Sequence, residues 1–401
     1  MNDMDIDNHF LKKKLKVLYI ADCCERYGAT ESMLQMISCL NDKGYIDPVI
    51  AVSNKDRLYN WSKKNGYEVI VTGHKAFLYD LGTTFLSCVF NLFYLPKRIL
   101  EYKNGNEKAI NILDNYLKTN KIDIIHTNVN RNDIGILLAK KYNIPHIFHI
   151  REFPPGDHFN LLTFNKNYID EINNGSDLIV AISKSVAKSW IKRGIDKSKI
   201  VDIWDGIVES TKKRKQAILT NDDIRFVMMG AICKEKGFFQ LIKAISIMPA
   251  SIKKKIHLDI YGNGMIYMHF LKFFCKIKGL DKIIKFKGYK ENVSEVLIDY
   301  DIGVVCSKKE GLGRATVEYM NSGCLVIASN TGANSEIICD NVTGLLYKYG
   351  DHCDLKNHIL SIFQNRKKYR LIAEKGKVFS ETYFQIQEYG EKIYRLYNDI
   401  L

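Results

Sequence analysis

The chain has 401 residues, of which 46% are hydrophobic and 26% charged, a composition typical of a soluble globular protein with ample core. This length exceeds what one hydrophobic core usually supports, so two domains are expected. The net charge of +14 fits nucleic acid, an anionic membrane surface or anionic substrates, but no basic motif interleaved with aromatic residues appears, which disfavours nucleic acid.

The cysteines and the N-terminus favour a cytoplasmic protein. The ten cysteines include no Cys-x-x-Cys pair, and Cys23 and Cys24 are adjacent, which neither a disulfide framework nor a zinc site would normally use. Residues 1–8 are acidic and polar, so we expect no signal peptide. The longest apolar stretch, residues 84–96, is interrupted by polar residues and is shorter than the roughly 20 residues of a membrane span. Reduced thiols and no membrane-crossing segment are therefore expected.

Strand-like apolar runs alternate with helical stretches almost throughout, a pattern typical of parallel sheets covered by helices. The strands predicted in the first half are residues 16–21, 46–52, 68–72, 122–127, 146–150 and 178–182. Those predicted in the second half are residues 225–230, 256–261, 283–287, 302–306 and 325–329. The fold class is therefore α/β, with domains over residues 1–205 and 224–381, a polar linker over residues 206–223, and a closing helix over residues 382–401.

In the first half, polar segments follow three of the predicted strands. Gly28-Ala-Thr30-Glu-Ser precedes a helix predicted over residues 33–40, so its backbone N–H groups can hold an anion, although helix capping by Thr30 explains the same residues. Two later segments lie at strand ends, where a histidine can equally be a satisfied structural side chain. They carry Asp123, His126, His149, Arg151 and Glu152.

The second half opens with a strand that ends at Gly230 and continues through Lys234-Glu-Lys236-Gly into a helix. Taken alone, a lysine at a helix start is usually a surface residue. After the next strand comes Gly262-Asn-Gly264, but the third glycine position of a dinucleotide fingerprint is Tyr267, so this motif is weak. A turn in which the backbone passes close to a ligand or to a neighbouring helix explains the glycines equally well.

The most informative segment is Glu310-Gly-Leu-Gly-Arg-Ala-Thr-Val-Glu318-Tyr-Met, which follows a buried-strand pattern directly. The order strand, glycine-rich loop, helix places free N–H groups and the positive end of a helix dipole at one spot, which suits a phosphate. Glu310 lies at the carboxyl end of the strand and Glu318 one turn into the helix, where ligands of open α/β sheets bind. A site that offers backbone donors to a phosphate and carboxylates to hydroxyl groups suits a sugar nucleotide.

This segment resembles the donor site of the retaining glycosyltransferases of family 4 (glycosyl transferases group 1), whose signature is E-G-x-G-x-x-x-x-E-x-M. The resemblance continues in residues 323–329, in Thr331-Gly-Ala-Asn-Ser-Glu336 and in residues 341–346. It implies the GT-B fold, in which two Rossmann-like domains with parallel sheets face a cleft. The last helix of such proteins commonly crosses back to the first domain.

The resemblance also implies roles for the donor site. Lys236 would hold the diphosphate, Glu318 the ribose, and Glu310 would lie close to the transferred sugar. Family members often carry an arginine after the glycine that matches Gly230; here this residue is Ala231, so one expected cation is missing. The other donor-binding candidates are Gly230, Lys234, Gly262, Gly311, Leu312, Gly313 and Arg314.

The first domain would bind the acceptor. The resemblance assigns this role to Gly28, Thr30, His149, Arg151 and Glu152, and makes His126 a third catalytic candidate beside Glu310 and Lys236. No protein nucleophile is evident, so we expect a same-face displacement in which the leaving phosphate helps to deprotonate the acceptor hydroxyl. The nucleotide-diphosphate sugar is a co-substrate, and no cofactor is expected. Domain closure would exclude water from the site.

Metal signals are weak in this sequence. Asp299-Tyr-Asp301 enters its strand at the amino end, opposite the expected cleft, so the helix dipole and cations are expected to replace a metal. The predicted function is retaining transfer of a sugar to a sugar or lipid-linked acceptor in cell-surface polysaccharide synthesis. Two alternatives are a sugar-nucleotide epimerase on the same fold and a non-catalytic protein that binds nucleotides or a membrane surface.

An aromatic stretch could bring this cytoplasmic chain to the inner face of the cell membrane. Phe85, Phe90, Phe93 and Tyr94 precede Lys97 and Arg98, a combination that suits an anionic headgroup layer where lipid-linked acceptors reside. Residues 267–278 have a similar character. For both stretches an ordinary core-facing helix is the alternative.

Overall fold

The computed structural model describes residues 14–21, 27–81, 85–155, 161–208, 214, 216–290 and 294–401. Cys23, Cys24, residues 1–8 and part of the predicted linker lie outside this range. The chain divides into two compact units. The first comprises Met1–Ala181, Ser189–Ile203 and Ile386–Leu401, and the second comprises Ile182–Lys188 and Trp204–Gln385.

The first unit is built on a parallel sheet of seven strands in the order β3-β2-β1-β5-β6-β8-β9. The strands are β1 (Leu15–Ile20), β2 (Ile46–Val52), β3 (Glu68–Val71), β5 (Ile124–Asn128), β6 (His146–Ile150), β8 (Leu178–Ala181) and β9 (Ile200–Asp202). The helices are α1 (Tyr27–Asp42), α2 (Arg57–Lys64), α3 (Phe85–Phe93), α4 (Leu95–Thr119), α5 (Ile134–Tyr142), α6 (Tyr168–Gly175) and α16 (Ile386–Asp399). Helix α7 (Lys184–Lys192) is divided between the units, with its residues up to Lys188 in the second unit and those from Ser189 in the first. A short antiparallel pair, β4 (Leu78–Asp80) and β7 (Leu161–Thr163), stands apart from the sheet.

Alternate residues of β1 supply two separate cores, because successive strand side chains point to opposite faces of a sheet. Val17 and Tyr19 join the core that contains α1 and α16. Leu18 and Ile20 join the core that contains α4 and α5. Helices thus cover both faces, and the strands are apolar on both sides, as parallel strands require.

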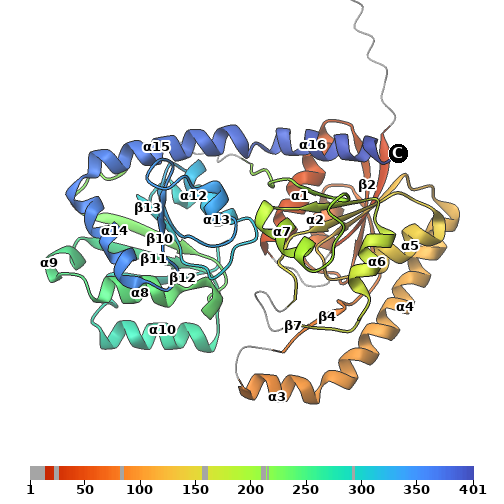
Figure 1. Cartoon of the computed structure of the whole chain (residues 1–401), viewed down its shortest axis with the longest axis horizontal. Coiled ribbons are helices and arrows are strands. Elements are labelled where there is room, and N and C mark those ends of the chain that lie inside the picture. Colours follow the sequence, from red (N-terminus) through yellow and green to blue (C-terminus); the bar gives the residue numbers. More distant parts are fainter. Residues whose placement is uncertain are drawn as a thin grey trace, which may run out of the picture. The chain divides into compact units, whose positions relative to one another are not determined.

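Helix α16 packs beside α1 in the first unit (Figure 1). Gly390 of α16 allows this close approach, since a Cβ atom there would lie 2.8 Å from the Cys39 sulfur. The Tyr397 hydroxyl reaches into the sheet and lies 2.9 Å from the Tyr19 hydroxyl. The last helix is therefore part of the core of the first unit.

The second unit is built on a parallel sheet of six strands in the order β12-β11-β10-β13-β14-β15. The strands are β10 (Ile224–Met229), β11 (Ile256–Tyr261), β12 (Ile284–Gly288), β13 (Ile302–Val305), β14 (Leu325–Ser329) and β15 (Leu345–Tyr347). The helices are η1 (Lys234–Lys236, 3₁₀), α8 (Phe238–Ser246), α9 (Ala250–Lys253), α10 (Ile266–Ile277), α11 (Ser294–Leu297), α12 (Arg314–Asn321), α13 (Asn334–Ile337), α14 (His352–Gln364) and α15 (Arg366–Tyr383).

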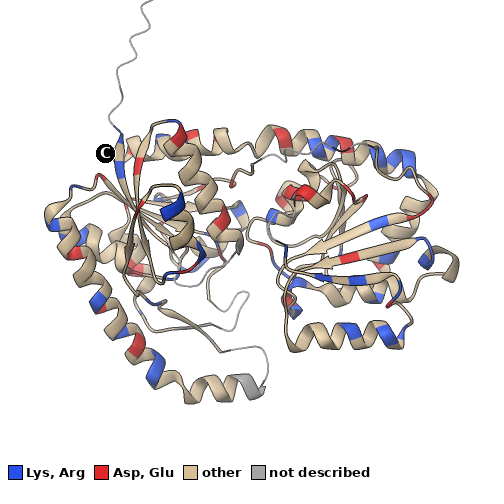
Figure 2. Ribbon diagram, turned by 180° about the vertical axis from the view of Figure 1, so that it is seen from behind, with Lys and Arg blue, Asp and Glu red and all other residues tan. Residues whose placement is uncertain are grey.

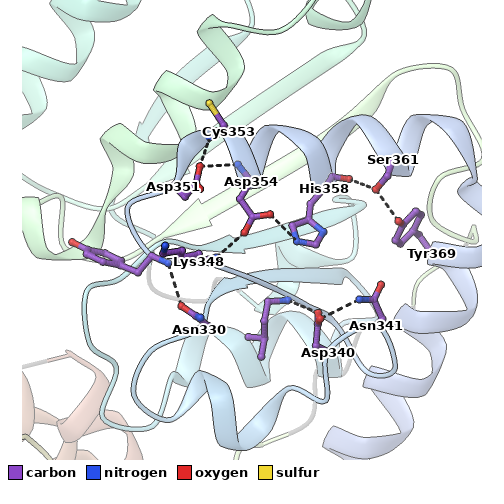
Figure 3. A network of polar contacts seen from close by, with 12 residues as sticks. Asn330, Asp340, Asn341, Lys348, Asp351, Cys353, Asp354, His358, Ser361 and Tyr369 are labelled. Atoms are coloured by element: carbon purple, nitrogen blue, oxygen red, sulfur yellow. Dashed lines mark hydrogen bonds and ion pairs between the residues drawn. The ribbon is translucent and has the colours of Figure 1, made fainter.

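The edge of the second unit near α14 carries a polar network that serves the fold (Figure 3). The Asp351 carboxylate accepts from the N–H groups of Cys353 and Asp354 and so caps the first turn of α14. The Asp354 carboxylate in turn accepts from the Lys348 N–H group at 2.8 Å. Helix capping and turn formation account for these contacts, and we assign them no chemistry.

All predicted strands occur, and both sheets confirm the predicted α/β class. The strands missed by the prediction are the three-residue elements β4, β7, β9 and β15, which are too short to show a hydrophobic period. Three boundaries differ from those predicted. The second unit includes residues 182–188 and 204–205, which were predicted in the first domain, and the described residues of the predicted linker. Helix α16 begins at Ile386, whereas the closing helix was predicted from residue 382.

Candidate active site

The glycine-rich loop after β13 leads directly into α12, as predicted. Gly313 lies at the N-cap of α12 with φ 78°, a left-handed conformation that favours glycine. A Cβ atom on Gly313 would also lie 2.8 Å from the Asn334 side-chain oxygen. Tyr319 anchors the helix, because its hydroxyl accepts from the Met229 N–H group at 2.9 Å while its ring packs over Gly303 of β13. The first-turn N–H groups of α12 therefore have a fixed position at the carboxyl end of the sheet.

This position is the point where the strand order of the second sheet reverses. From β10 the chain proceeds outward through β11 and β12, and from β13 it proceeds in the other direction through β14 and β15. Open α/β sheets bind ligands at the carboxyl ends of the strands that flank such a reversal. The loops after β10 and β13 contain Lys236 and Glu310.

Lys236 and Glu310 form an ion pair with 2.6 Å between Nζ and Oε1. The side chains retain 33% and 13% of their exposure, so the pair can be reached by a ligand. The Ser307 hydroxyl also donates to Glu310 Oε1. Gly237 makes the approach of the two loops possible, since a Cβ atom there would lie 2.0 Å from the Cys306 carbonyl oxygen.

A second loop supports Glu310 from behind. The Ala333 N–H group donates to the Glu310 carbonyl oxygen at 3.0 Å. Gly332, with φ 56°, must be glycine in this arrangement, because a Cβ atom would lie 2.3 Å from the same oxygen. The Thr331-Gly segment of the sequence therefore packs against the backbone of Glu310 and holds it in position.

Glu318 and Arg314 pair with each other along one face of α12. The distance between Arg314 Nε and Glu318 Oε1 is 2.8 Å, and both side chains are about four-fifths buried. Arg314 is therefore engaged by Glu318 in this structure. The remaining lysine of the predicted donor set, Lys234, is exposed in η1.

The glycines after β10 and β11 have a structural explanation. Gly230 has φ 139° and Gly262 φ 146°, and a Cβ atom on Gly262 would lie 1.9 Å from the Gly230 carbonyl oxygen. Gly264 meets Ile232 in the same way, with 2.4 Å between its Cβ position and the Ile232 carbonyl oxygen. Close backbone packing of two adjacent loops accounts for all three, and their donor-binding role stays a prediction.

Two acidic residues of the sequence motifs stabilise the fold. Glu336 accepts from the N–H groups of Lys184 at 3.0 Å and Ser185 at 2.6 Å, and so caps the start of α7. Asp301 accepts from the N–H groups of Leu219 at 2.8 Å and Arg225 at 2.9 Å. Both carboxylates therefore serve neighbouring loops and helices.

His126 lies in the interior of the first unit and is fully buried. Its Nδ1 is 2.8 Å from the Tyr397 hydroxyl of α16, and its Nε2 is 3.2 Å from His149 Nδ1. Burial lowers the pKa of both histidines well below the usual value, so both rings are neutral. Both nitrogens of His126 contact protein groups, which favours a structural role, and its catalytic role stays a prediction.

Arg151 is also buried and is tied to the interior. Its Nε donates to the Asn128 side-chain oxygen at 2.6 Å, and its Nη2 to the Tyr389 hydroxyl of α16 at 3.5 Å. Glu152 follows at the surface of the unit, where its carbonyl oxygen accepts from Trp190 Nε1 at 2.8 Å. The structure thus brings His126, His149 and Arg151 together as a buried polar cluster next to α16.

The expected loop at Gly28 and Thr30 is helical. Helix α1 begins at Tyr27, six residues before the predicted start, and both residues lie in its first turn. Thr30 is buried, whereas a Cβ atom on Gly28 would meet nothing within 4 Å. A helix N-terminus still lies at this position, so the predicted anion-binding role is compatible with the geometry.

The sequence analysis missed a polar loop directly after β5. Residues 130–133, Asn-Arg-Asn-Asp, are all buried although each is polar. The signal was a run of four polar residues that follows a predicted strand closely, at the carboxyl end of that strand. Each residue of this loop retains a buried side-chain atom that makes no hydrogen bond with a described residue.

Two absences apply to the described part of the chain. No group of three or more His, Cys, Asp or Glu side chains that could hold a metal ion occurs within it. No helix there is both long and apolar enough to cross a bilayer. The eight cysteines described have free thiols.

Comparison with known proteins places the chain in a family. The model of glycosyltransferase family 4 matches residues 56–210, and that of glycosyl transferases group 1 matches residues 209–379. An uncharacterized glycosyltransferase of Methanocaldococcus jannaschii is 28% identical over 69% of this chain and 75% of that protein. The capsular polysaccharide biosynthesis glycosyltransferase CapH of Staphylococcus aureus is 25% identical over 55% of this chain and 63% of its own length.

Among solved structures, that of Anabaena HepE in complex with UDP has a TM-score of 0.75. It is 15% identical and covers 96% of this chain and 100% of its own, a likeness that concerns the fold. With the two parallel-sheet units, this match confirms the predicted GT-B fold. The chain therefore belongs to the family 4, group 1 glycosyltransferases.

Proposed function

We propose that this glycosyltransferase moves a sugar from a nucleotide-diphosphate donor, with retention, to a sugar or lipid-linked sugar in cell-surface polysaccharide synthesis. The observation that carries the proposal is the Lys236–Glu310 pair at the strand-order reversal of the second sheet. A cation for the diphosphate and a carboxylate for sugar hydroxyls are what such a donor requires there. The UDP and UDP-glucose complexes of HepE and the capsular role of CapH support the same reading.

In this proposal the donor binds to the second unit. Its diphosphate takes the place that Glu310 occupies beside Lys236, and the first-turn N–H groups of α12 complete the phosphate site. The Glu318 carboxylate, oriented by Arg314, accepts hydrogen bonds from the ribose hydroxyls. Glu310 then lies next to the sugar that is transferred.

The reaction is a same-face displacement. The bond between the anomeric carbon and the diphosphate oxygen breaks, and a bond between that carbon and the acceptor oxygen forms on the same face. The acceptor proton passes to the leaving diphosphate, whose growing negative charge Lys236 and the α12 dipole stabilise. The metal ion that other enzymes use for this charge is not needed in the proposal.

The acceptor is assigned to the first unit, and docking of that unit on lipid is part of the proposal. Helix α3 exposes Phe90 by 62% and Phe93 by 80%, and Lys97 and Arg98 follow in α4. In the second unit α10 exposes Phe270, Phe273 and Ile277 and carries lysines without an acidic residue (Figure 2). Such faces suit an anionic membrane interface and a lipid-linked acceptor.

A panel of sugar nucleotides tests the proposal. We expect one donor to raise the melting temperature of the purified protein and to be consumed when acceptor is present. Lys236→Ala should reduce turnover by roughly 100-fold because the cation acts on charge that develops in the transition state. Lys375→Ala, which removes an exposed lysine of the same unit, is the matched control.

Two results would contradict the proposal. Lys236→Ala with unchanged turnover would remove Lys236 from the diphosphate site. Conversion of the donor to its epimer without acceptor would indicate a sugar-nucleotide epimerase, the alternative on the same fold.

A further inference from the structure

The loop that follows β5 occupies the ligand-binding edge of the first sheet. From β1 the chain continues through β2 and β3 on one side of β1, whereas β5 and β6 lie on its other side. The strand order of the first sheet therefore reverses between β1 and β5. Asn132 Nδ2 donates to the carbonyl oxygen of Ala21, the residue directly after β1, at 3.3 Å. The Asn130 side-chain oxygen accepts from the Glu152 N–H group, beyond β6, at 3.2 Å. The loop is therefore fixed at the reversal point, where open α/β sheets bind ligands.

Arg131 is buried in this loop without a charge partner. Its exposure is 4%, and its Nε makes no hydrogen bond with any described residue. No ion pair of Arg131 with a described residue is found either. Arginine stays protonated in proteins, and burial of an unpaired charge is costly, so buried arginines are nearly always paired.

Arg151 shows how this chain treats a buried arginine that serves the fold. It is 5% exposed, nearly the same as Arg131, but its guanidinium donates to the Asn128 side chain at 2.6 Å and also contacts the Tyr389 hydroxyl. The two buried arginines follow neighbouring strands. The guanidinium of Arg151 has hydrogen-bond acceptors in the protein, whereas Arg131 has none among the described residues. The missing acceptor of Arg131 points to a ligand.

The neighbours of Arg131 define the chemistry of that ligand. Asn130 Nδ2 is a second buried donor without a partner, and Asn132 Oδ1 and Asp133 Oδ1 are buried acceptors without partners among the described residues. The unpartnered donors suit an anionic oxygen, and the unpartnered acceptors suit hydroxyl groups. An anionic sugar presents both kinds of group.

The backbone of the loop is strained at the same place. Val129 has φ 74°, which is unusual for a β-branched residue. The Arg131 N–H group closes a tight turn onto the Val129 carbonyl oxygen at 2.9 Å. Strain of this kind persists where surrounding contacts enforce it, often at binding sites. It orients the segment that carries Asn130 and Arg131.

We propose that Arg131, with Asn130, binds an anionic group, phosphate or carboxylate, on the sugar acceptor. The guanidinium fork binds either group through two parallel hydrogen bonds, and Asn132 and Asp133 accept from the sugar hydroxyls. This inference rests on the proposed transferase function and specifies its acceptor class as a sugar phosphate or an acidic sugar.

Thermal-shift titrations of the whole protein with glucose 1-phosphate, glucuronate and glucose test the inference. The two anionic sugars separate phosphate from carboxylate recognition, and glucose is the neutral reference. We expect at least one anion to raise the melting temperature of the wild type, and Arg131→Met to weaken its apparent Kd at least about tenfold. Without ligand, Arg131→Met should be no less stable than the wild type, because it removes an unpaired buried charge.

Two control variants separate this site from other anion sites. Arg98→Met removes an exposed arginine of the same unit, and Lys236→Gln removes the cation of the proposed donor site. Arg98→Met should keep the full anion-induced shift, and Lys236→Gln should keep the part of the shift that Arg131→Met loses. An equal shift in Arg131→Met, or no shift of the wild type with either anion, would overturn the inference.

Arg131→Lys covers the case in which the methionine variant does not fold. It keeps the charge but loses the planar fork, so anion affinity should fall while the melting temperature without ligand is maintained. Unchanged anion affinity in Arg131→Lys would speak against fork recognition and overturn the inference. Binding of the nucleotide sugar is measured separately, so a chain that binds anions but no sugar nucleotide would refute the proposed function alone.

Discussion

Lys236 and Glu310 are 74 residues apart in the chain, yet their side chains lie 2.6 Å apart at the reversal point of the second sheet. Each residue follows a different strand, β10 or β13, and these two strands are hydrogen-bonded neighbours. Gly237 and Gly332 permit the close packing that holds the pair in place. In this structure Glu310 occupies the partner position of the cation that we assign to the diphosphate.

Glu310→Gln should lower the rate of sugar transfer without weakening UDP binding. The substitution keeps the shape of the side chain but removes the negative charge that competes with phosphate for Lys236. Calorimetric titration with UDP and a transfer assay measure the two effects separately. Weaker UDP binding in this variant would show that Glu310 does not compete with the diphosphate; Glu374→Gln, on α15, serves as control.

Glu318→Gln should weaken donor binding by about 1–3 kcal/mol, the cost of losing a charge-assisted hydrogen bond to ribose. The fold should be retained, because the Arg314–Glu318 pair lies within one helix face and is partly exposed. Glu381→Gln breaks another (i, i+4) pair of the second unit, with Lys377, and should leave donor affinity unchanged. Equal donor affinity in Glu318→Gln and wild type, measured by calorimetry, would remove Glu318 from the site.

Activity should persist in excess chelator, because the α12 N-terminus and Lys236 supply the positive charge at the leaving diphosphate. The test compares initial rates of transfer with and without EDTA after exhaustive dialysis. A metal ion should at most modulate the rate. Loss of activity in EDTA, with recovery on addition of magnesium or manganese, would contradict this donor chemistry.

Stability should decrease as the pH falls from 7 to 5. Burial lowers the pKa of His146 to about 3 and of His74 to about 4, and it also depresses the pKa of His126 and His149. Below the usual histidine pKa of about 6.5 the unfolded chain therefore binds more protons than the folded one. Each of these histidines should then cost up to about 1.4 kcal/mol of unfolding free energy per pH unit.

Urea unfolding at pH 7, 6 and 5 measures this dependence. Between pH 7 and 5 the change in unfolding free energy reports on the histidines. Carboxylates with lowered pKa values, such as that of Glu391, affect stability only at lower pH. His257→Gln, which changes an exposed histidine, is the comparison variant. An unfolding free energy that is constant between pH 7 and 5 would refute the assignment of these histidines as buried and neutral.

Helix α3 should dock on anionic vesicles. Phe90 and Phe93 are exposed by 62% and 80%, and Lys97 and Arg98 follow them, so binding should weaken as salt screens the charges but persist in part through the apolar side chains. Co-sedimentation with anionic and neutral vesicles measures this. The variant Phe90→Ser/Phe93→Ser should lose most of the binding, and Phe270→Ser/Phe273→Ser reports on α10. No binding of the wild type to either vesicle would favour a soluble acceptor.

The sequence determined the fold class and the donor loop because both depend on local patterns. Continuous apolar runs between helical stretches specify parallel strands, and the order strand, glycine-rich loop, helix places Glu310 and Glu318 without knowledge of distant contacts. The short edge strands β9 and β15 were missed because three residues show no period. The start of α1 was misplaced because Gly28 and Thr30 are typical of a loop, yet they lie in the first helical turn.

Only the tertiary structure decided which polar residues are partners and which lack one. His126 looked like a site residue at a strand end, but Tyr397, 271 residues later, occupies its Nδ1 and makes it part of the core. Arg151 and Arg131 are both arginines that follow a strand closely, so the sequence does not distinguish them. The structure gives Arg151 its acceptors, whereas Arg131 Nε has no acceptor among the described residues. The reason is physical: strand and helix patterns are set by neighbours in sequence, whereas burial and hydrogen bonding of a side chain depend on segments that the fold brings together from far along the chain.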